Sequence, residues 1–462
     1  MNWVVPILAL SVLAVAAVSR RLTGTPMTPA MVFMVIGVLV GPEVASEVNL
    51  SPTGAAVRSL AEATLALVLF SDASRIKLST LRGEYQVPLR LLAIGLPLTI
   101  ALGAVIASGI FDQLTLAEAV VLGVLLAPTD AALGQAVVTE PRLPSRIRQG
   151  LNVESGLNDG ICVPLLFIAI AAADVESHVT NGHHAVRIVA EELGYGALGG
   201  LASGLLLAAV VRAAGQRQLI ASSWMRLIPV AGASLAYGLA AALGGSGFIA
   251  AFLAGALFGG LLSRESESAV GLIEELGELL NGVTFVVFGA VLLGPALGQL
   301  SWPIVAYAVL SLTLIRILPV GIAMLGSGAR PPTIGFLGWF GPRGLASIVF
   351  AVIVVEQSHL PHVGTILVAT YVTVGLSVLA HGASAAPLAD RYARWFESHP
   401  RNRRPAMESV PAGAHRTRGT GVAAIERSTG HSDGAATGLQ SSEADDAPAA
   451  IAVHGARDVS QT

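Results

Sequence analysis

The feature that most constrains this chain is a succession of apolar stretches, nearly free of charge, that continues to about residue 388. A helix needs about 20 mainly apolar residues to cross the hydrocarbon core of a membrane, and each stretch is long enough or nearly so. Charged residues make up 12% of the sequence, against about 25% in soluble domains. We therefore predict an all-α polytopic membrane protein.

Hydropathy and helix-breaking residues divide the apolar region into about thirteen spans with short connections. The first span has no basic segment before it, so we interpret it as a membrane helix rather than a secretory signal. Thirteen spans permit two inverted six-helix repeats around a linker span, an arrangement found in many transporters. The predicted spans are 3–19, 27–42, 57–72, 87–110, 116–139, 147–172, 188–211, 226–243, 247–262, 271–293, 302–325, 335–355 and 363–386.

Basic residues mark one side of the membrane. Connections after odd-numbered spans hold Arg20, Arg75 and Arg142 among others, whereas the opposite connections hold only Arg58 and Arg187. Because positively charged connections stay in the cytoplasm, we predict an outside N-terminus and a cytoplasmic C-terminus.

Residues 389–462 differ in composition from the rest of the chain. They are rich in small and polar residues and almost lack aromatic ones, so they cannot bury enough apolar surface to fold. We interpret them as a disordered, dispensable cytoplasmic tail, with a regulatory role as the alternative. The single cysteine, Cys162, excludes an internal disulfide.

Two spans are interrupted. Pro128-Thr129-Asp130 breaks the fifth span, and Gly341-Pro342-Arg343-Gly344 breaks the twelfth. Broken helices expose backbone dipoles that suit ion binding at mid-membrane, and we expect the two breaks to face each other, because an isolated break in lipid is costly. Asp130 then either binds an ion or neutralises a half-helix N-terminus. Arg343 is expected to offset carbonyl groups at the twelfth-span break.

The segment from Asn152 to Gly160 carries the most polar chemistry. Ser155 and Asp159 are four residues apart, as are Glu154 and Asn158, so the two pairs lie on adjoining faces of a helix. Carboxylate, hydroxyl and amide oxygens are ligands that suit Na⁺. Burial disfavours the charged form of Asp159, so this carboxylate can hold either a proton or a cation. Competition for one carboxylate is sufficient for obligatory exchange.

The remaining charged residues receive structural interpretations. Glu154 and Arg316 are expected to form a buried structural ion pair, because either charge alone would be costly. The histidines show no metal-ligand spacing, and no nucleotide loop or nucleophile–base arrangement indicates an enzyme. Four acidic residues near span ends are expected to be solvated: Glu274, Glu275, Glu278 and Glu356.

These motifs resemble those of the monovalent cation:proton antiporters, the group that includes NhaP-type sodium/proton exchangers and the animal NHE exchangers. The resemblance covers residues 1–388 approximately. It rests on Leu69-Phe70-Ser71-Asp72 with Leu81-Arg82, on Ala127-Pro128-Thr129-Asp130, on Glu154 to Gly160, and on Trp339 to Gly344. The departures are Asp72 for the usual Glu, Gly156 for Leu, Ala131 for Pro and Pro342 for Leu.

The resemblance implies an NhaA/NhaP-like fold with crossed broken helices. It implies a homodimer in the plasma membrane with no nucleic-acid partner, in which a core of spans within 87–172 and 302–386 moves against a dimerisation domain of the remaining spans. It also implies that Na⁺ (or Li⁺) and H⁺ bind Asp159 alternately, without a cofactor. Asn158, Ser155, Thr129 and Asp130 are the implied helpers.

The sequence leaves the stoichiometry, the role of Asp72 and the transported ion open. The Asn158-Asp159 pair is associated in this family with electroneutral exchange, so a one-for-one stoichiometry is the expectation. The short side chain of Asp72 leaves any ligand or gating role for that position in doubt. K⁺/H⁺ exchange is the alternative activity, followed by a channel-like or receptor-like relative, although a degenerate relative is expected to lose Asp159 or Asn158.

Overall fold

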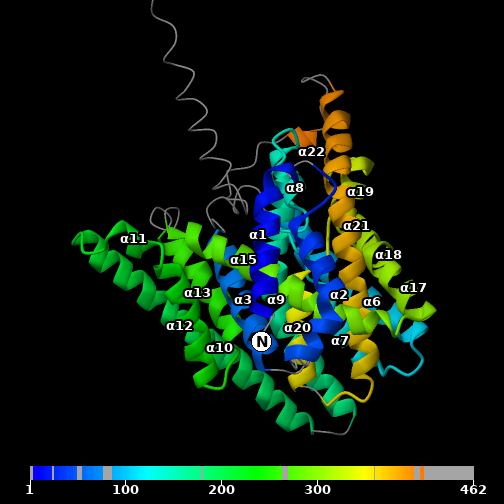
Figure 1. The fold of residues 1–462 in the computed structure, drawn as a ribbon, viewed down its shortest axis with the longest axis horizontal. Helices are drawn as coiled ribbons and strands as arrows, with labels where there is room; N and C mark the ends of the chain where they lie inside the picture. The colour runs from blue at the N-terminus through cyan, green and yellow to red at the C-terminus, as the bar shows by residue number, and fades with distance from the viewer. Residues whose placement is uncertain are drawn as a thin grey trace, which may run out of the picture. The chain divides into compact units, whose positions relative to one another are not determined.

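The computed structural model describes the membrane portion of the chain and a short stretch after it. Every regular element in these ranges is a helix (Figure 1), and the helices fall on the thirteen predicted spans in order. Seven helical stretches among the described residues are long and apolar enough to cross a membrane, and four further apolar stretches are 10–17 residues long. The described residues are 4–22, 25–48, 55–75, 86–177, 181–262, 269–357, 359–399 and 406–409.

Among the first seven predicted spans, the sixth and seventh form the longest helices, and the fifth span is broken as predicted. The elements are α1 (Val4–Leu22), α2 (Pro29–Val48), α3 (Ala55–Ser74), α5 (Gln86–Arg90), η1 (Leu91–Gly95), α6 (Leu96–Ile110), α7 (Leu116–Leu125), α8 (Gln135–Val138), α9 (Ser145–Glu176) and α10 (Gly182–Gln216).

The remaining spans include the second broken helix, whose halves are α19 and α20. The elements are α11 (Ser222–Met225), α12 (Ile228–Ala242), α13 (Gly247–Leu261), α15 (Gly271–Val287), η2 (Phe288–Leu293), α16 (Gly294–Leu297), α17 (Trp302–Leu312), α18 (Leu314–Ala323), α19 (Pro331–Trp339), α20 (Leu345–Gln357), α21 (Val363–Glu397) and α22 (Ala406–Ser409).

Two membrane helices contain π-helical segments, η1 and η2, and each segment ends shortly before a proline, Pro97 or Pro295. Proline has no backbone N–H, so the regular helical hydrogen bond to the residue four positions earlier cannot form. A wider turn next to the proline is a common way for a helix to accommodate that loss.

Helices α10 and α13 pack closely because glycines recur every four residues along α10. A Cβ atom added to Gly200 would lie 2.7 Å from the Ala250 carbonyl oxygen, and one added to Gly204 would lie 3.0 Å from the Ala254 Cα. Lipid provides little hydrophobic driving force between helices, so close approach over small residues replaces it.

Buried apolar residues of the described chain form three clusters. One of them joins α3, α10, α12, α13 and the start of α15 through residues such as Phe70, Ala254 and Phe258. These helices belong to the spans predicted for the dimerisation domain, although the division into a core and a dimerisation domain, like the inverted repeat, stays a prediction.

The predicted boundary at residue 388 is too early. Helix α21 continues to Glu397, because Tyr392, Ala393 and Phe396 are buried and the Tyr392 ring stacks on Phe336 of α19. Composition alone missed this because the extension also carries four charged residues, Asp390, Arg391, Arg394 and Glu397. Most of the predicted tail, residues 410–462, lies outside the described residues, as does the Leu81-Arg82 motif.

Candidate cation and proton site

The two helix breaks meet, as predicted. Helix α7 ends at Leu125 and α19 ends at Trp339, and a non-helical segment follows each. The backbone N–H of Asp130 in the first break donates a 2.8 Å hydrogen bond to the Pro342 carbonyl in the second. Each break therefore supplies a partner for backbone groups that lipid could not satisfy.

Asp130 and Arg343 compensate the charges of the half-helix ends. Arg343 is fully buried, and its Nη1 donates to the carbonyl oxygens of Ala127 at 3.0 Å and Pro128 at 3.4 Å. Asp130 Oδ2 accepts from the backbone N–H of Leu345, the first residue of α20, at 3.2 Å. A carboxylate at a helix N-terminus and a cation at a C-terminus are both favourable.

One expectation needs correction here. Arg343 was expected to offset carbonyl groups at its own, twelfth-span break, but its guanidinium reaches the carbonyl groups at the end of α7 instead. The reason is the crossing itself, which brings the two breaks within a side chain's length of each other. For Asp130, the contacts with Leu345 and Ala132 N–H groups support the charge-neutralising role.

The glycines of the second break leave room for two charged side chains. A Cβ atom on Gly344 would collide with the Asp130 carboxylate, and one on Gly341 would collide with the Arg316 guanidinium. The backbone of this break therefore approaches charged groups more closely than any residue with a side chain could.

Helix α9 is fastened to the first break by two of the predicted site residues. Ser155 Oγ donates to the Thr129 carbonyl at 2.6 Å and accepts from the Ala131 N–H at 2.8 Å. Asn158 Nδ2 donates to Thr129 Oγ1 at 2.7 Å. Thr129, Ser155 and Asn158 therefore lie together, and their hydrogen bonds hold the first break against α9.

Asp159 lies on α9 directly after Asn158 and is only 7% exposed. It is one helical turn from Ser155, so the two side chains share a face of α9. A carboxylate buried to this degree in a membrane helix is costly as a bare charge. Asp159 thus lies on α9 next to the residues that bind the first break, where a proton or a cation can neutralise its charge.

The predicted contact between Glu154 and Arg316 is present. Arg316 of α18 donates two hydrogen bonds to the Glu154 carboxylate, at 2.6 and 2.9 Å, and both side chains are 3% exposed. This two-point geometry uses both carboxylate oxygens of Glu154. Glu154 therefore joins α9 to α18 and is occupied by its partner.

Asp72 lies beside α9 rather than far from the site. A Cβ atom on Gly156 would be 3.4 Å from the Asp72 Cβ, so the glycine at this position lets α3 pack against α9. Arg75 Nη1 contacts Asp72 Oδ1 at 3.4 Å and Arg75 Nη2 contacts Glu274 at 3.0 Å. Asp72 thus belongs to a charged group that includes α15.

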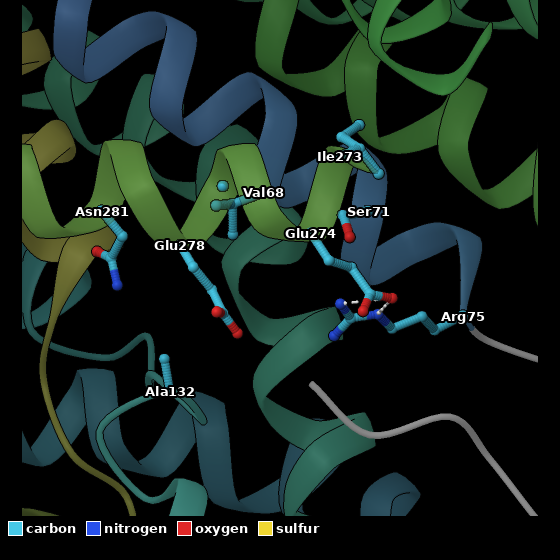
Figure 2. A pocket seen from close by; sticks show the side chains of 9 residues that line it. Val68, Ser71, Arg75, Ala132, Ile273, Glu274, Glu278 and Asn281 are labelled. Carbon is cyan, nitrogen blue, oxygen red and sulfur yellow. Dashed lines mark hydrogen bonds and ion pairs between the residues drawn. The ribbon is translucent and has the colours of Figure 1, made fainter. Parts of the chain in front are cut away.

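Two small hollows between α15 and the first break were not predicted. Figure 2 shows the first, about 30 Å³, in which Glu278 points from α15 toward the segment that carries Ala132. The second, about 100 Å³, also reaches Ala132, Glu278 and Asn281. Residues 274, 278 and 281 share one face of α15, and this polar stripe was the signal in the sequence. Glu278, which was expected to be solvated at a span end, is exposed but lines both hollows.

A second set of missed residues surrounds Arg343. The Arg343 backbone N–H donates to Ser377 Oγ at 2.7 Å, and Ser377 Oγ lies 3.1 Å from His381 Nδ1. The His381 Nε2 lies 2.9 Å from the Trp339 carbonyl oxygen at the end of α19. The other ring nitrogen, Nδ1, also lies 3.0 Å from the Ser377 carbonyl oxygen. His381 therefore fixes the end of the half-helix that precedes the second break.

Comparison with known proteins identifies the family and the fold. The sequence profile of the family described as "Sodium/hydrogen exchanger, transmembrane" matches residues 7–391. The structure of the sodium proton antiporter MjNhaP1 from Methanocaldococcus jannaschii matches with a TM-score of 0.70 at 19% identity, over 85% of this chain and 98% of that one. The predicted all-helical, NhaP-like fold is confirmed.

Two curated relatives illustrate the sequence similarity. The K(+)/H(+) antiporter NhaP2 of Shewanella oneidensis is 26% identical over 380 residues, which is 81% of this chain and 64% of the relative. A Na(+)/H(+) antiporter of Schizosaccharomyces pombe is 26% identical over 264 residues, which is 53% of this chain and 55% of the relative. This chain thus spans less than two thirds of the length of either relative.

Proposed function

The chain belongs to the transmembrane sodium/hydrogen exchanger family, and we propose that it is a secondary antiporter that exchanges a monovalent cation for protons. The observation that carries this proposal is the position of Asp159. Its carboxylate is buried in the membrane helix α9, one turn from Ser155 and next to Asn158, the two residues that bind the break at Thr129. Family membership places the chain among transporters rather than enzymes.

Exchange follows from the cost of burying this carboxylate in its ionised form. A buried Asp159 is stabilised by a bound proton or by a bound cation. Binding of one lowers the affinity for the other, because both neutralise the same carboxylate. Thr129 Oγ1, Ser155 Oγ and Asn158 Oδ1 each keep a lone pair beyond the hydrogen bonds that hold the break. These oxygens can complete the coordination of the cation. One charge is traded for another, so the exchange is electroneutral.

If the site moves across the membrane, the helices that form it must move together as one rigid unit. The breaks bind each other, Ser155 and Asn158 bind α9 to the first break, and Arg316 binds α18 to Glu154. We assign these helices to the moving core of a homodimer and the group of α3, α10, α12, α13 and α15 to the dimerisation domain. Alternating access then carries Asp159 past α3 and α15.

The hollows beside Glu278 supply the entrance to the site from one side. With the C-terminus in the cytoplasm, the start of α15 and the hollows next to it lie on the cytoplasmic side. The carboxylate of Glu278 and the amide of Asn281 line that entrance. Acidic side chains raise the local concentration of cations.

Na⁺ (or Li⁺) is the proposed cation, because the matching family is described as a sodium/hydrogen exchanger and the oxygen ligands around Asp159 suit it. K⁺ is the second candidate, and the similarity to the K(+)/H(+) antiporter NhaP2 favours it. Hard oxygen ligands accept either ion, so selectivity depends on the size of the coordination shell.

The test is proton flux in proteoliposomes that contain a pH-sensitive dye. Pulses of Na⁺, Li⁺ or K⁺ should drive proton movement in the wild type, and Asp159→Asn should abolish it while the protein stays folded. Asp112→Asn makes the same chemical change at an exposed position and should transport normally. Cation-driven proton flux that survives in Asp159→Asn overturns the mechanism.

The same vesicles determine the ion and the stoichiometry. The concentration of each cation that gives half-maximal flux identifies the preferred ion. Clamping the membrane potential should leave the rate unchanged if the exchange is electroneutral. A rate that follows the imposed potential contradicts one-for-one exchange.

A further inference from the structure

A hollow of about 350 Å³ lies between α19 and α21, away from Asp159. This volume is within the range of about 300–1,000 Å³ typical of small-molecule sites. Its wall is mainly aromatic, and its one charged residue is Arg391. The lining residues are Pro332, Gly335, Phe336, Trp339, Phe340, Leu388, Arg391, Tyr392 and Trp395.

The hollow extends along the membrane normal rather than across it. Ser377 of α21 binds the backbone of the second break, and such breaks lie near the middle of the bilayer. Arg391 follows Ser377 by fourteen residues on the same helix, which is about 21 Å at 1.5 Å per residue. The hydrocarbon core extends about 15 Å from the middle of the membrane and the headgroups about 20 Å. Arg391 is thus at headgroup level.

The other end of the hollow reaches hydrocarbon depth. Trp339 stacks near His381, with ring centroids 4.9 Å apart, and His381 follows Ser377 by a single helical turn. Between Trp339 and Arg391 the wall consists of rings and aliphatic carbon. A ligand that fits must be apolar at the deep end and may be polar only at the level of Arg391.

Arg391 is available for a ligand. Its side chain is exposed, and within the described part of the chain it forms no hydrogen bond or ion pair. Arg394, one turn further along α21, differs because it pairs with Asp390, which also contacts Arg142. Among the described residues, no carboxylate lines the hollow. The charge at the polar end therefore complements an anion.

We propose that this hollow binds an anionic phospholipid from the leaflet in which α21 ends. The phosphate of the lipid contacts the Arg391 guanidinium, and an acyl chain lies against Phe336, Trp339 and Trp395. Basic residues between membrane helices bind anionic headgroups, and tryptophan and tyrosine favour the interface. The bound chain stabilises α19 in its place beside α21, next to the second break.

The first test measures lipid binding to the purified full-length protein by native mass spectrometry. Titration with dioleoylphosphatidylglycerol should reveal one tight site that dioleoylphosphatidylcholine does not share. Arg391→Gln should weaken the phosphatidylglycerol site about tenfold, because a charge-assisted contact to phosphate is lost. Arg394→Gln is the matched control and should bind as the wild type does. Equal affinity for the two lipids, or an equal loss in both variants, overturns the proposal.

A second variant tests the hollow itself. A Cβ atom on Gly335 meets no atom within 4 Å, so Gly335→Leu can fill the space without disturbing the fold. It should remove the phosphatidylglycerol site and preserve the melting temperature. Gly321→Leu, at another open glycine outside the hollow, should keep the site. Retained tight binding in Gly335→Leu contradicts the proposed location.

A third measurement distinguishes the lipid from the protein's own tail. A photo-crosslinking amino acid in place of Leu388 should capture phospholipid in membranes. Capture of a peptide from residues 410–462 instead would show that the tail occupies the hollow and would overturn the proposal.

Discussion

Asp130 and Arg343 lie in different helix breaks, and each compensates a half-helix end at the break of the other residue: Asp130 the start of α20, and Arg343 the end of α7. Asp130 accepts from the first N–H of α20, and Arg343 donates to the last carbonyl groups around α7. The two residues therefore act across the crossing rather than within their own segments. This reciprocity makes the two breaks a single structural unit.

Removal of either residue should destabilise the protein, and removal of both should cost less than the sum. Asp130→Asn weakens the acceptor of two backbone N–H groups, and Arg343→Met leaves the Ala127 carbonyl without its donor. Such losses cost about 1–3 kcal/mol each. The double variant removes both charges together. Thermal unfolding in detergent, arranged as a double-mutant cycle, measures the coupling. Strictly additive losses would show that the two residues act independently.

Glu154→Gln should be strongly destabilising, because it leaves the buried Arg316 charge without its carboxylate. The expected loss is about 3–5 kcal/mol, measured as a fall in the unfolding midpoint. Glu154→Leu combined with Arg316→Met should recover much of it. Glu62→Gln is the control, since Glu62 pairs with a half-exposed Arg58 and such pairs contribute about 1 kcal/mol or less. Similar losses for the two glutamine variants would argue against a buried structural pair.

Glu278→Gln should raise the cation concentration needed for half-maximal flux by a few fold and leave the maximal rate nearly unchanged. The carboxylate lines the entrance without belonging to the buried site, so its field acts on cation entry. The effect should diminish at high ionic strength. Glu275→Gln, an exposed neighbour outside both hollows, is the control. A fall in maximal rate alone would contradict an entrance role.

The segment after α21 should divide into a structural and a dispensable part. Glu408 is 1% exposed, and its Oε1 accepts from the Arg330 N–H at 2.9 Å and from Thr333 Oγ at 2.6 Å, at the start of α19. Glu408→Ala, or truncation after His399, should lower the melting temperature by the equivalent of about 1–3 kcal/mol. Truncation after Ser409 should not. Equal stability of the two truncated proteins would remove the capping role.

Much of the fold was predictable because each span is a local pattern. Apolar length and turn residues predicted the span order, and the prolines predicted both breaks. The meeting of the breaks was also predictable, since backbone groups in lipid need partners. Helical spacing placed Ser155, Asn158 and Asp159 on adjoining faces, and the structure brings the first two to Thr129.

The unpredicted features depend on which helices are neighbours. Periodicity shows that Glu274, Glu278 and Asn281 share a face but does not show that Ala132 faces them. The direction of Arg343 and the contact of His381 with Trp339 likewise need the crossing geometry. Glu408 was assigned to a disordered tail because a four-residue helix leaves no periodic signal.

The glycine at position 156 has a consequence for the temperature dependence of turnover. Gly156 has no side chain that interlocks with α3 next to Asp72. Movement of α9 along α3 at this position therefore does not have to separate packed side chains. Less packing enthalpy is then lost on the way to the barrier. We expect the turnover rate to depend less steeply on temperature than in a Gly156→Leu variant. In that variant each transport cycle must separate the leucine side chain from its packing against α3.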